Sequence, residues 1–199
     1  MLRSLTYSKI EPVLNRAAGF LAEKKITPNQ LTLAGLGISV LAGWAYSGGL
    51  FFLGLLLLIA AGAGDLFDGP LARRTGKTSR FGAFLDSTVD RYSDFFLFGG
   101  FAYYFAAEES WGLFLTSLGV IFGWFATSYA KARAESLIPS CPVGIFERPE
   151  RMLLLGIGSL VPPILPWMLG ILLVGTHATA IQRIVYVWKA LKEPPAPRP

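Results

Sequence analysis

Long runs of apolar residues, separated by short polar breaks, dominate the hydropathy pattern of this chain. Six apolar blocks of 15 to 24 residues predict helices at 31–46, 50–64, 84–107, 111–129, 152–167 and 168–187. This is the length that a helix needs to cross the hydrocarbon of a bilayer. Three prolines interrupt the block 152–167 near its end, which makes it the weakest of the six. We therefore expect an all-α integral membrane protein with six transmembrane helices.

The distribution of basic residues predicts how these helices are oriented. With six spans, all 18 lysines and arginines fall on one side, and the turns on the opposite side contain only Glu108 and Glu109 as charged residues. Basic residues accumulate in cytoplasmic loops, so we expect both termini and the long loops in the cytoplasm of a cell with this protein in its inner membrane. Five spans would send the basic tail outside, and we reject that arrangement.

The two ends of the chain differ in character from the apolar blocks. Residues 1–26 alternate leucine, isoleucine, valine and alanine with basic residues at helical spacing, without the continuous apolar stretch of a cleaved signal. They predict an amphipathic helix lying on the cytoplasmic membrane surface. Residues 27–191 form the expected six-helix transmembrane domain. Four prolines among the last seven residues predict a disordered tail at 192–199.

Composition agrees with a membrane protein and narrows its chemistry. Hydrophobic residues make up 53% and charged residues 16% of the chain, too few to cover a soluble domain with polar groups. Cys141 and His177 are the single cysteine and histidine, so metal binding must rely on carboxylates, which select hard cations such as magnesium, manganese or calcium. The pI near 9.5 indicates contact with anionic lipid rather than nucleic acid.

Four aspartates lie at the expected cytoplasmic ends of the second and third spans. Asp65 and Asp68 are three residues apart, and Asp86 and Asp90 are four apart, so each pair shares a helix face. Antiparallel helices joined by a short loop would bring the pairs face to face, where their mutual repulsion calls for one or two divalent cations. Two alternatives are a structural network with Arg73, Arg74 or Arg91, and a cation transporter. A transporter would need carboxylates at the bilayer centre and on both sides, which this pattern lacks.

Eight residues around these aspartates match a complete family signature. The spacing D-x2-D-G-x2-A-R-x8-G-x3-D-x3-D occurs here without substitution, at Asp65, Asp68, Gly69, Ala72, Arg73, Gly82, Asp86 and Asp90. The chain thereby resembles the CDP-alcohol phosphotransferases. The resemblance extends to the six-span layout and the preceding surface helix. It implies a homodimeric membrane enzyme that transfers a phosphatidyl or similar group from a CDP-linked donor to an alcohol and releases CMP.

The resemblance also implies roles for these residues. Asp65, Asp68 and Asp86 would be ligands of magnesium or manganese, with two ions expected, and Asp90 would be a ligand, the general base, or both. Arg73 would hold a donor phosphate, while Gly69, Ala72 and Gly82 leave room for the cytidine diphosphate. Asn29 and Thr32 look like the family's other nucleotide contact, although the same turn could simply start a helix.

A second basic set suggests the acceptor alcohol. Segments 128–135 and 144–151 look like the corresponding segments of bacterial phosphatidylinositol-phosphate synthases, in which the matching residues would bind the acceptor's phosphate. The residues concerned are Ser128, Lys131, Arg151 and Arg183. Several cations suit an acceptor that already has a phosphate dianion. Inositol phosphate is therefore the leading acceptor and glycerol 3-phosphate the alternative, while the same cations could merely anchor helix ends at the interface. Either diacylglycerol or an ether lipid could form the donor's tails.

Overall fold

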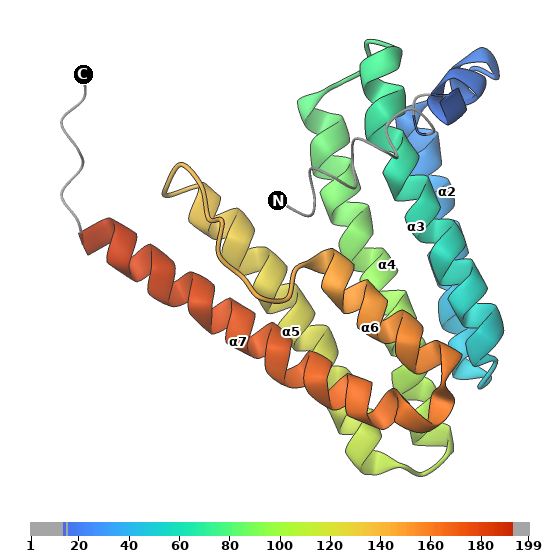
Figure 1. Ribbon diagram of the computed structural model, residues 1–199, viewed down its shortest axis with the longest axis vertical. Coiled ribbons are helices and arrows are strands. Elements are labelled where there is room, and N and C mark those ends of the chain that lie inside the picture. The colour runs from blue at the N-terminus through green and yellow to red at the C-terminus, as the bar shows by residue number, and fades with distance from the viewer. Residues whose placement is uncertain (1–13, 15, 193–199) are drawn as a thin grey trace. The chain divides into compact units, whose positions relative to one another are not determined.

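The computed structural model describes residue 14 and residues 16–192 of the 199-residue chain (Figure 1). The predictions for residues 1–13 and for the tail at 193–199 therefore lie outside the described residues. The helices are α2 (Pro28–Ser47), α3 (Phe51–Arg74), α4 (Arg80–Ala107), α5 (Trp111–Glu135), α6 (Arg148–Leu160), the 3-10 turn η1 (Pro162–Ile164) and α7 (Leu165–Lys192). Residues 16–23 are helical as well. Since the described residues contain no strand, the predicted all-α fold is confirmed.

Three segments are long and apolar enough to cross a bilayer. They are Phe51–Arg74, Trp111–Glu135 and Pro162–Lys192 among the described residues. Their exposed side chains include Phe52, Ile59 and Leu115, each at least 60% exposed, as expected of helices that face lipid rather than water. The structure thus agrees with a membrane protein, and the count of six spans remains a prediction.

Two helices differ in their bounds from the pattern of apolar blocks. Helix α3 continues ten residues beyond the predicted end at 64, and α4 begins at Arg80 rather than at 84, so all four aspartates lie within helices. Polar residues interrupt an apolar block without ending a helix, because the backbone hydrogen bonds continue. Even Pro70 is accommodated inside α3, in its last turns.

The apolar block 152–167 is divided between two helices. Helix α6 ends at Leu160 and α7 begins at Leu165, with η1 between them. Pro162 and Pro163 lack the backbone N–H groups that would continue α6, which explains the break. With 13 residues, α6 is about 20 Å long, shorter than a hydrocarbon core of about 30 Å.

The helices fall into two compact units. The first contains α2 up to Tyr46 together with Leu53–Leu97, and the second contains Ser47–Phe52 together with the chain from Phe98 onward. In the first unit, glycines allow close helix contacts: a Cβ atom at Gly43 of α2 would overlap the carbonyl oxygen of Phe96 on α4, and one at Gly54 of α3 would overlap the ring of Tyr46. Small residues of this kind let backbones approach within a membrane.

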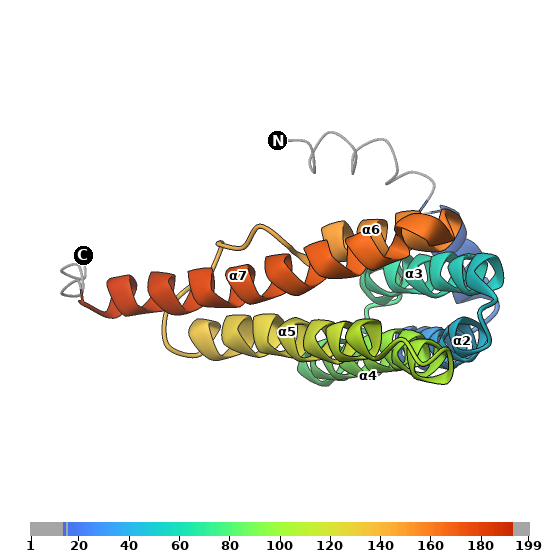
Figure 2. The same ribbon diagram turned by 90° about the horizontal axis from the view of Figure 1, so that it is seen from below.

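In the second unit, α7 packs along both α5 and α6 (Figures 1 and 2). A Cβ at Gly123 of α5 would overlap the Thr176 hydroxyl of α7, so that this crossing also depends on a glycine. The fully buried Trp124 lies 4.7 Å from Phe98 between ring centroids, with the two rings tilted by 55°. These contacts position the polar loop between α5 and α6.

Gly43→Ala should lower the stability of the protein, because the added methyl group must push α2 away from the Phe96 carbonyl. We expect a loss of about 1–3 kcal/mol, measured by reversible denaturation in detergent. The matched control is Gly37→Ala on the same helix, where nothing lies within 4 Å of an added Cβ and alanine favours the helix. Equal stability of the two variants would contradict the close α2–α4 contact.

Candidate active site

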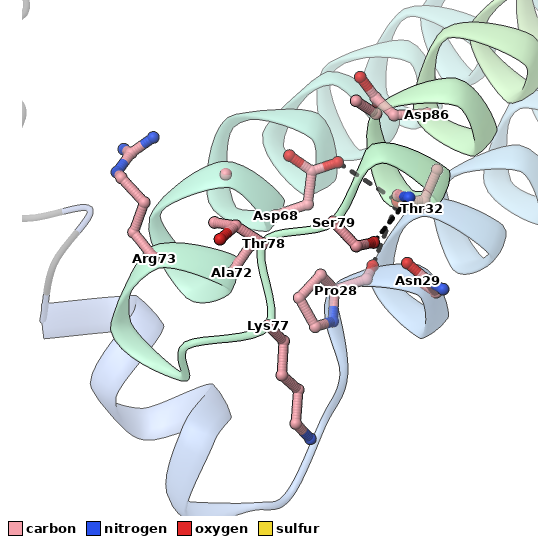
Figure 3. Close-up of a pocket in the computed structure, with 13 residues that line it drawn as sticks. Pro28, Asn29, Thr32, Asp68, Ala72, Arg73, Lys77, Thr78, Ser79 and Asp86 are labelled. Carbon is pink, nitrogen blue, oxygen red and sulfur yellow. Dashed lines mark hydrogen bonds between the residues drawn. The ribbon is translucent and has the colours of Figure 1, made fainter.

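An open pocket lies in the first unit, where α2 begins, α3 ends and α4 begins. Its volume is roughly 280 Å³, near the lower end of small-molecule sites of about 300–1,000 Å³. The lining residues come from these three helix ends and from the loop after α3: Pro28, Asn29, Thr32, Asp68, Gly69, Ala72, Arg73, Lys77, Thr78, Ser79, Gly82, Ala83 and Asp86 (Figure 3). Eight of the residues predicted from sequence to bind the donor or a metal therefore share one pocket.

Asp68 and Thr32 connect α3 to α2 at the wall of this pocket. The Thr32 hydroxyl donates to the Asp68 carboxylate at 3.3 Å and also lies 3.1 Å from the Pro28 carbonyl oxygen of its own helix (Figure 3). Thr32 is only 5% exposed, so this contact is sheltered from water. A hydrogen bond to a carboxylate orients that carboxylate as well as stabilising its charge.

Negative charge is concentrated around Asp68. Asp65 and Asp86 are close enough to repel the Asp68 carboxylate, and Asp86 lines the same pocket from α4. Oxygen ligands of this type fit a hard divalent cation, which would relieve the repulsion. Asp90 lies one helical turn beyond Asp86 on α4 and is not among the lining residues. Among the described residues, no three acidic, histidine or cysteine side chains converge as a complete metal site would require.

Small residues line part of the pocket wall on α3 and α4. A Cβ at Gly82 would stand 3.1 Å from the Ser79 hydroxyl and 3.7 Å from the Asn29 side-chain oxygen. The Gly82 N–H donates to the Ser79 hydroxyl at 2.9 Å, which caps the first turn of α4. The exposed Arg73 folds back along α3, since a Cβ at Gly69 would lie 3.5 Å from its Nη1.

Some residues that line this pocket were not predicted from the sequence. Lys77, Thr78 and Ser79 lie in the eight-residue spacer of the signature, where the pattern fixes no residue type. The signal that could have found them is their composition, since a basic residue followed by two hydroxyls just before a helix is typical of loops that contact anions.

The second unit holds a separate charged cluster. The carboxylate Oε1 of Glu147 lies 3.5 Å from Lys131 Nζ and 3.8 Å from Arg183 Nη2. Arg183 is 3% exposed, and its Nε and Nη1 donate to the carbonyl oxygens of Val143 and Thr127 at 3.0 and 2.6 Å. Two of the predicted acceptor residues are thus brought together, joined by an acid that the sequence analysis did not select.

Arg151 and Ser128 lie on the helices that flank this cluster. Arg151 is buried in the first turn of α6, where its Nε donates to the Glu147 carbonyl oxygen at 3.1 Å and its guanidinium lies 4.1 Å from the Trp124 ring centroid. Such stacking holds a guanidinium in place without neutralising its charge. Ser128 is half-buried on α5, one turn before Lys131.

Sequence comparison identifies relatives along most of the chain. The family model for CDP-alcohol phosphatidyltransferase matches residues 25–181. The chain is 37% identical over 191 residues to an archaetidylinositol phosphate synthase of Methanothermobacter thermautotrophicus, covering 93% of this chain and 95% of that protein. It is 38% identical over 202 residues to a phosphatidylinositol phosphate synthase of Streptomyces avermitilis, covering 94% and 82%.

Comparison with solved structures also identifies a phosphatidylinositol phosphate synthase. A crystal structure of Mycobacterium tuberculosis phosphatidylinositol phosphate synthase with CDP-DAG bound is 30% identical, has a TM-score of 0.85, and is matched over 94% of this chain and 98% of that one. The same enzyme in complex with manganese and citrate has a TM-score of 0.83, is also 30% identical, and is matched over 94% and 92%. With Asp68 and Asp86 of the signature lining one pocket and its sequence matched from residue 25 to 181, the chain belongs to the CDP-alcohol phosphatidyltransferase family and is a CDP-alcohol phosphotransferase.

Proposed function

We propose that this protein transfers a phosphatidyl group from a CDP-linked lipid to a hydroxyl of inositol phosphate and releases CMP. The observation that supports it most is the pocket in which six of the eight signature residues, from α3 and α4, lie together with Thr32 of α2. In this reaction the acceptor oxygen forms a bond to the lipid-side phosphorus, the bond from that phosphorus to the CMP oxygen breaks, and CMP leaves with the electron pair. The hydroxyl proton passes to a base.

The donor's nucleotide and pyrophosphate would occupy the pocket of the first unit. Its small residues Gly69, Ala72 and Gly82 admit phosphates close to the backbone, and Arg73 supplies a positive charge. Asn29 and Thr32 would contact the nucleotide from α2. The CDP-DAG that is bound in the tuberculosis enzyme supports a donor of this class.

Asp65, Asp68, Asp86 and Asp90 would hold magnesium or manganese, with two ions expected. A divalent cation bound there would neutralise the pyrophosphate and stabilise the leaving phosphate. Thr32 would keep the Asp68 carboxylate turned toward the pocket, because its hydroxyl donates to Oδ2. The repulsion among these carboxylates favours cation binding.

Asp90 would accept the proton of the attacking hydroxyl. It lies one turn beyond Asp86 on the same face of α4 and is half-buried, which suits a base that acts next to the donor pocket rather than within its lining. A second role as metal ligand is compatible with the same position.

The phosphate of the acceptor would bind to Ser128, Lys131, Arg151 and Arg183. Buried arginines that are already oriented by carbonyl oxygens and an aromatic ring suit a dianion, because little side-chain ordering remains to be done on binding. The names of the similar bacterial and archaeal enzymes favour inositol phosphate over glycerol 3-phosphate. They include diacyl and archaeal lipid products, so either donor tail is compatible.

We further propose six membrane spans, a homodimer, and an active site on the cytoplasmic side. The one-sided distribution of the 18 basic residues supports this orientation. With 13 residues, α6 would be the shortest of the six spans.

Purified protein in lipid nanodiscs should release CMP from CDP-diacylglycerol only when both a divalent cation and inositol phosphate are present. The assay supplies inositol phosphate, glycerol 3-phosphate, free inositol and serine one at a time. Faster transfer to glycerol 3-phosphate would replace the leading acceptor. Efficient transfer to free inositol or serine would contradict the phosphate-binding role of the basic cluster, and full activity in excess chelator would contradict the metal requirement.

Thr32→Val should raise the KM for the CDP-lipid about tenfold, because the isosteric side chain no longer orients the Asp68 carboxylate. The measurement is CMP release at varied donor concentration. Thr116→Val is the matched control, since the Thr116 hydroxyl donates only within its own helix, to Gly112 at 2.8 Å. An unchanged donor KM in Thr32→Val would remove Thr32 from the site.

Asp90→Asn should lower kcat at least a hundredfold while the donor dissociation constant stays within about threefold, because a base acts on the acceptor hydroxyl and not on the nucleotide. Donor binding is measured by titration, and Glu108→Gln, in the turn that follows the opposite end of α4, provides the control. A collapse of donor affinity would instead assign Asp90 to the metal. Near-normal turnover would exclude Asp90 from the mechanism.

A further inference from the structure

Glu147 places a negative charge where an anionic ligand of the basic cluster would sit. Its Oε1 lies between Lys131 Nζ and Arg183 Nη2, at 3.5 and 3.8 Å. We propose that the Glu147 carboxylate is an internal substitute for the acceptor's phosphate, which must displace it in order to bind. This inference rests on the proposed function for the assignment of Lys131 and Arg183 to the acceptor phosphate.

Arg183 is oriented without help from Glu147. Its Nε donates to the Val143 carbonyl oxygen and its Nη1 donates to the Thr127 carbonyl oxygen. The third nitrogen, Nη2, faces the Glu147 carboxylate. Space beside Nη2 is kept by Gly144, whose φ of +146° favours glycine and where a Cβ would come within 2.9 Å of Nη2. The guanidinium therefore presents a preformed anion site that survives loss of the carboxylate.

The main chain that supports Glu147 is also fixed. The Phe146 N–H donates to the Thr179 hydroxyl at 3.1 Å, and the Phe146 ring packs where Gly175 of α7 has no side chain. The Glu147 carbonyl oxygen accepts from Arg151 Nε at 3.1 Å. Two residues of α7 and one of α6 thus hold the backbone at this position.

The side chain of Glu147, by contrast, has room to leave. It is 34% exposed, and Lys131 is 40% exposed, whereas Arg183 is 4% exposed at its side chain. The ion pair with Lys131 joins two partly exposed side chains, and a pair of this kind contributes little binding energy. A phosphate dianion has a second charge and more acceptor oxygens, so it should displace the Glu147 carboxylate from the same cations.

Occupation by Glu147 lowers the apparent affinity of the site for any anion. The observed dissociation constant equals the intrinsic one divided by the fraction of molecules in which the site is open. Ambient monoanions and dilute phosphate are thereby kept out, while the acceptor at its working concentration still enters. Glu147 acts here as a specificity-determining residue that does not itself take part in the chemistry.

Glu147→Gln should bind inorganic phosphate about three- to tenfold more tightly than the wild type, measured by calorimetric titration of the full-length protein in detergent without donor. The matched control is Glu150→Gln, which removes the same charge from an exposed position in the first turn of α6 and should leave affinity unchanged. Lys131→Gln added to Glu147→Gln should abolish the gain. Unchanged or weaker phosphate binding by Glu147→Gln would overturn the proposal and assign Glu147 a purely structural role.

Glu147→Asp provides a second variant in case the glutamine variant folds poorly. Its shorter carboxylate should reach the cations less well and give a smaller gain in phosphate affinity. Affinity equal to or below that of wild type would again overturn the proposal.

The acceptor KM in the CMP-release assay tests the acceptor assignment and the role of Glu147 separately. If no protein uses inositol phosphate but Glu147→Gln still binds phosphate more tightly, the acceptor assignment fails and the role of Glu147 stands. If wild type uses inositol phosphate and Glu147→Gln has a raised KM, the role of Glu147 fails and the function stands.

Discussion

Charged groups held among apolar helices are costly unless an opposite charge or a hydrogen-bond partner reaches them, and both polar sites of this protein are organised around that cost. Asp68 lies half-buried at the end of α3 with Asp65 and Asp86 close enough to repel it. The Thr32 hydroxyl satisfies one of its oxygens, but a hydroxyl has no charge. A divalent cation bound at the proposed site would relieve the remaining repulsion, so an arrangement that is unfavourable for folding would favour metal binding.

The basic cluster contains buried positive charges, which are stabilised in a different way. Arg183 is almost fully buried, and its guanidinium is satisfied by two backbone carbonyl oxygens, while Glu147 supplies the opposite charge. The guanidinium of Arg151 lies over the ring of Trp124. Carbonyl oxygens and aromatic rings orient a guanidinium without cancelling its charge. Glu147, the carboxylate that pairs with both Lys131 and Arg183, is a third exposed.

Glycines make the close helix contacts that hold these groups in place. Gly43 and Gly54 bring α2, α4 and α3 together in the first unit, and Gly123 and Gly175 do the same for α5, α7 and the loop residue Phe146 in the second. In a bilayer, lipid tails compete with apolar side chains for helix surfaces, so packing depends on close backbone approach rather than on burial from water. The polar sites therefore depend on residues that have no polar group themselves.

The sequence by itself determined the all-α class, the positions of most helices and most of the residues that share one pocket. Apolar blocks report helix cores directly, and the eight-residue signature has fixed spacing within two helices, so Asp68, Gly69, Ala72, Arg73, Gly82 and Asp86 could be assigned together. Helix ends were less predictable, as α3 continues through polar residues to Arg74 and prolines divide α6 from α7. Only the tertiary structure placed Thr32 against Asp68, 36 residues away, and Glu147 against Lys131 and Arg183. The reason is that contacts between distant segments depend on which helices pack together and on loop paths such as 143–147, and neither leaves a periodic trace in the sequence.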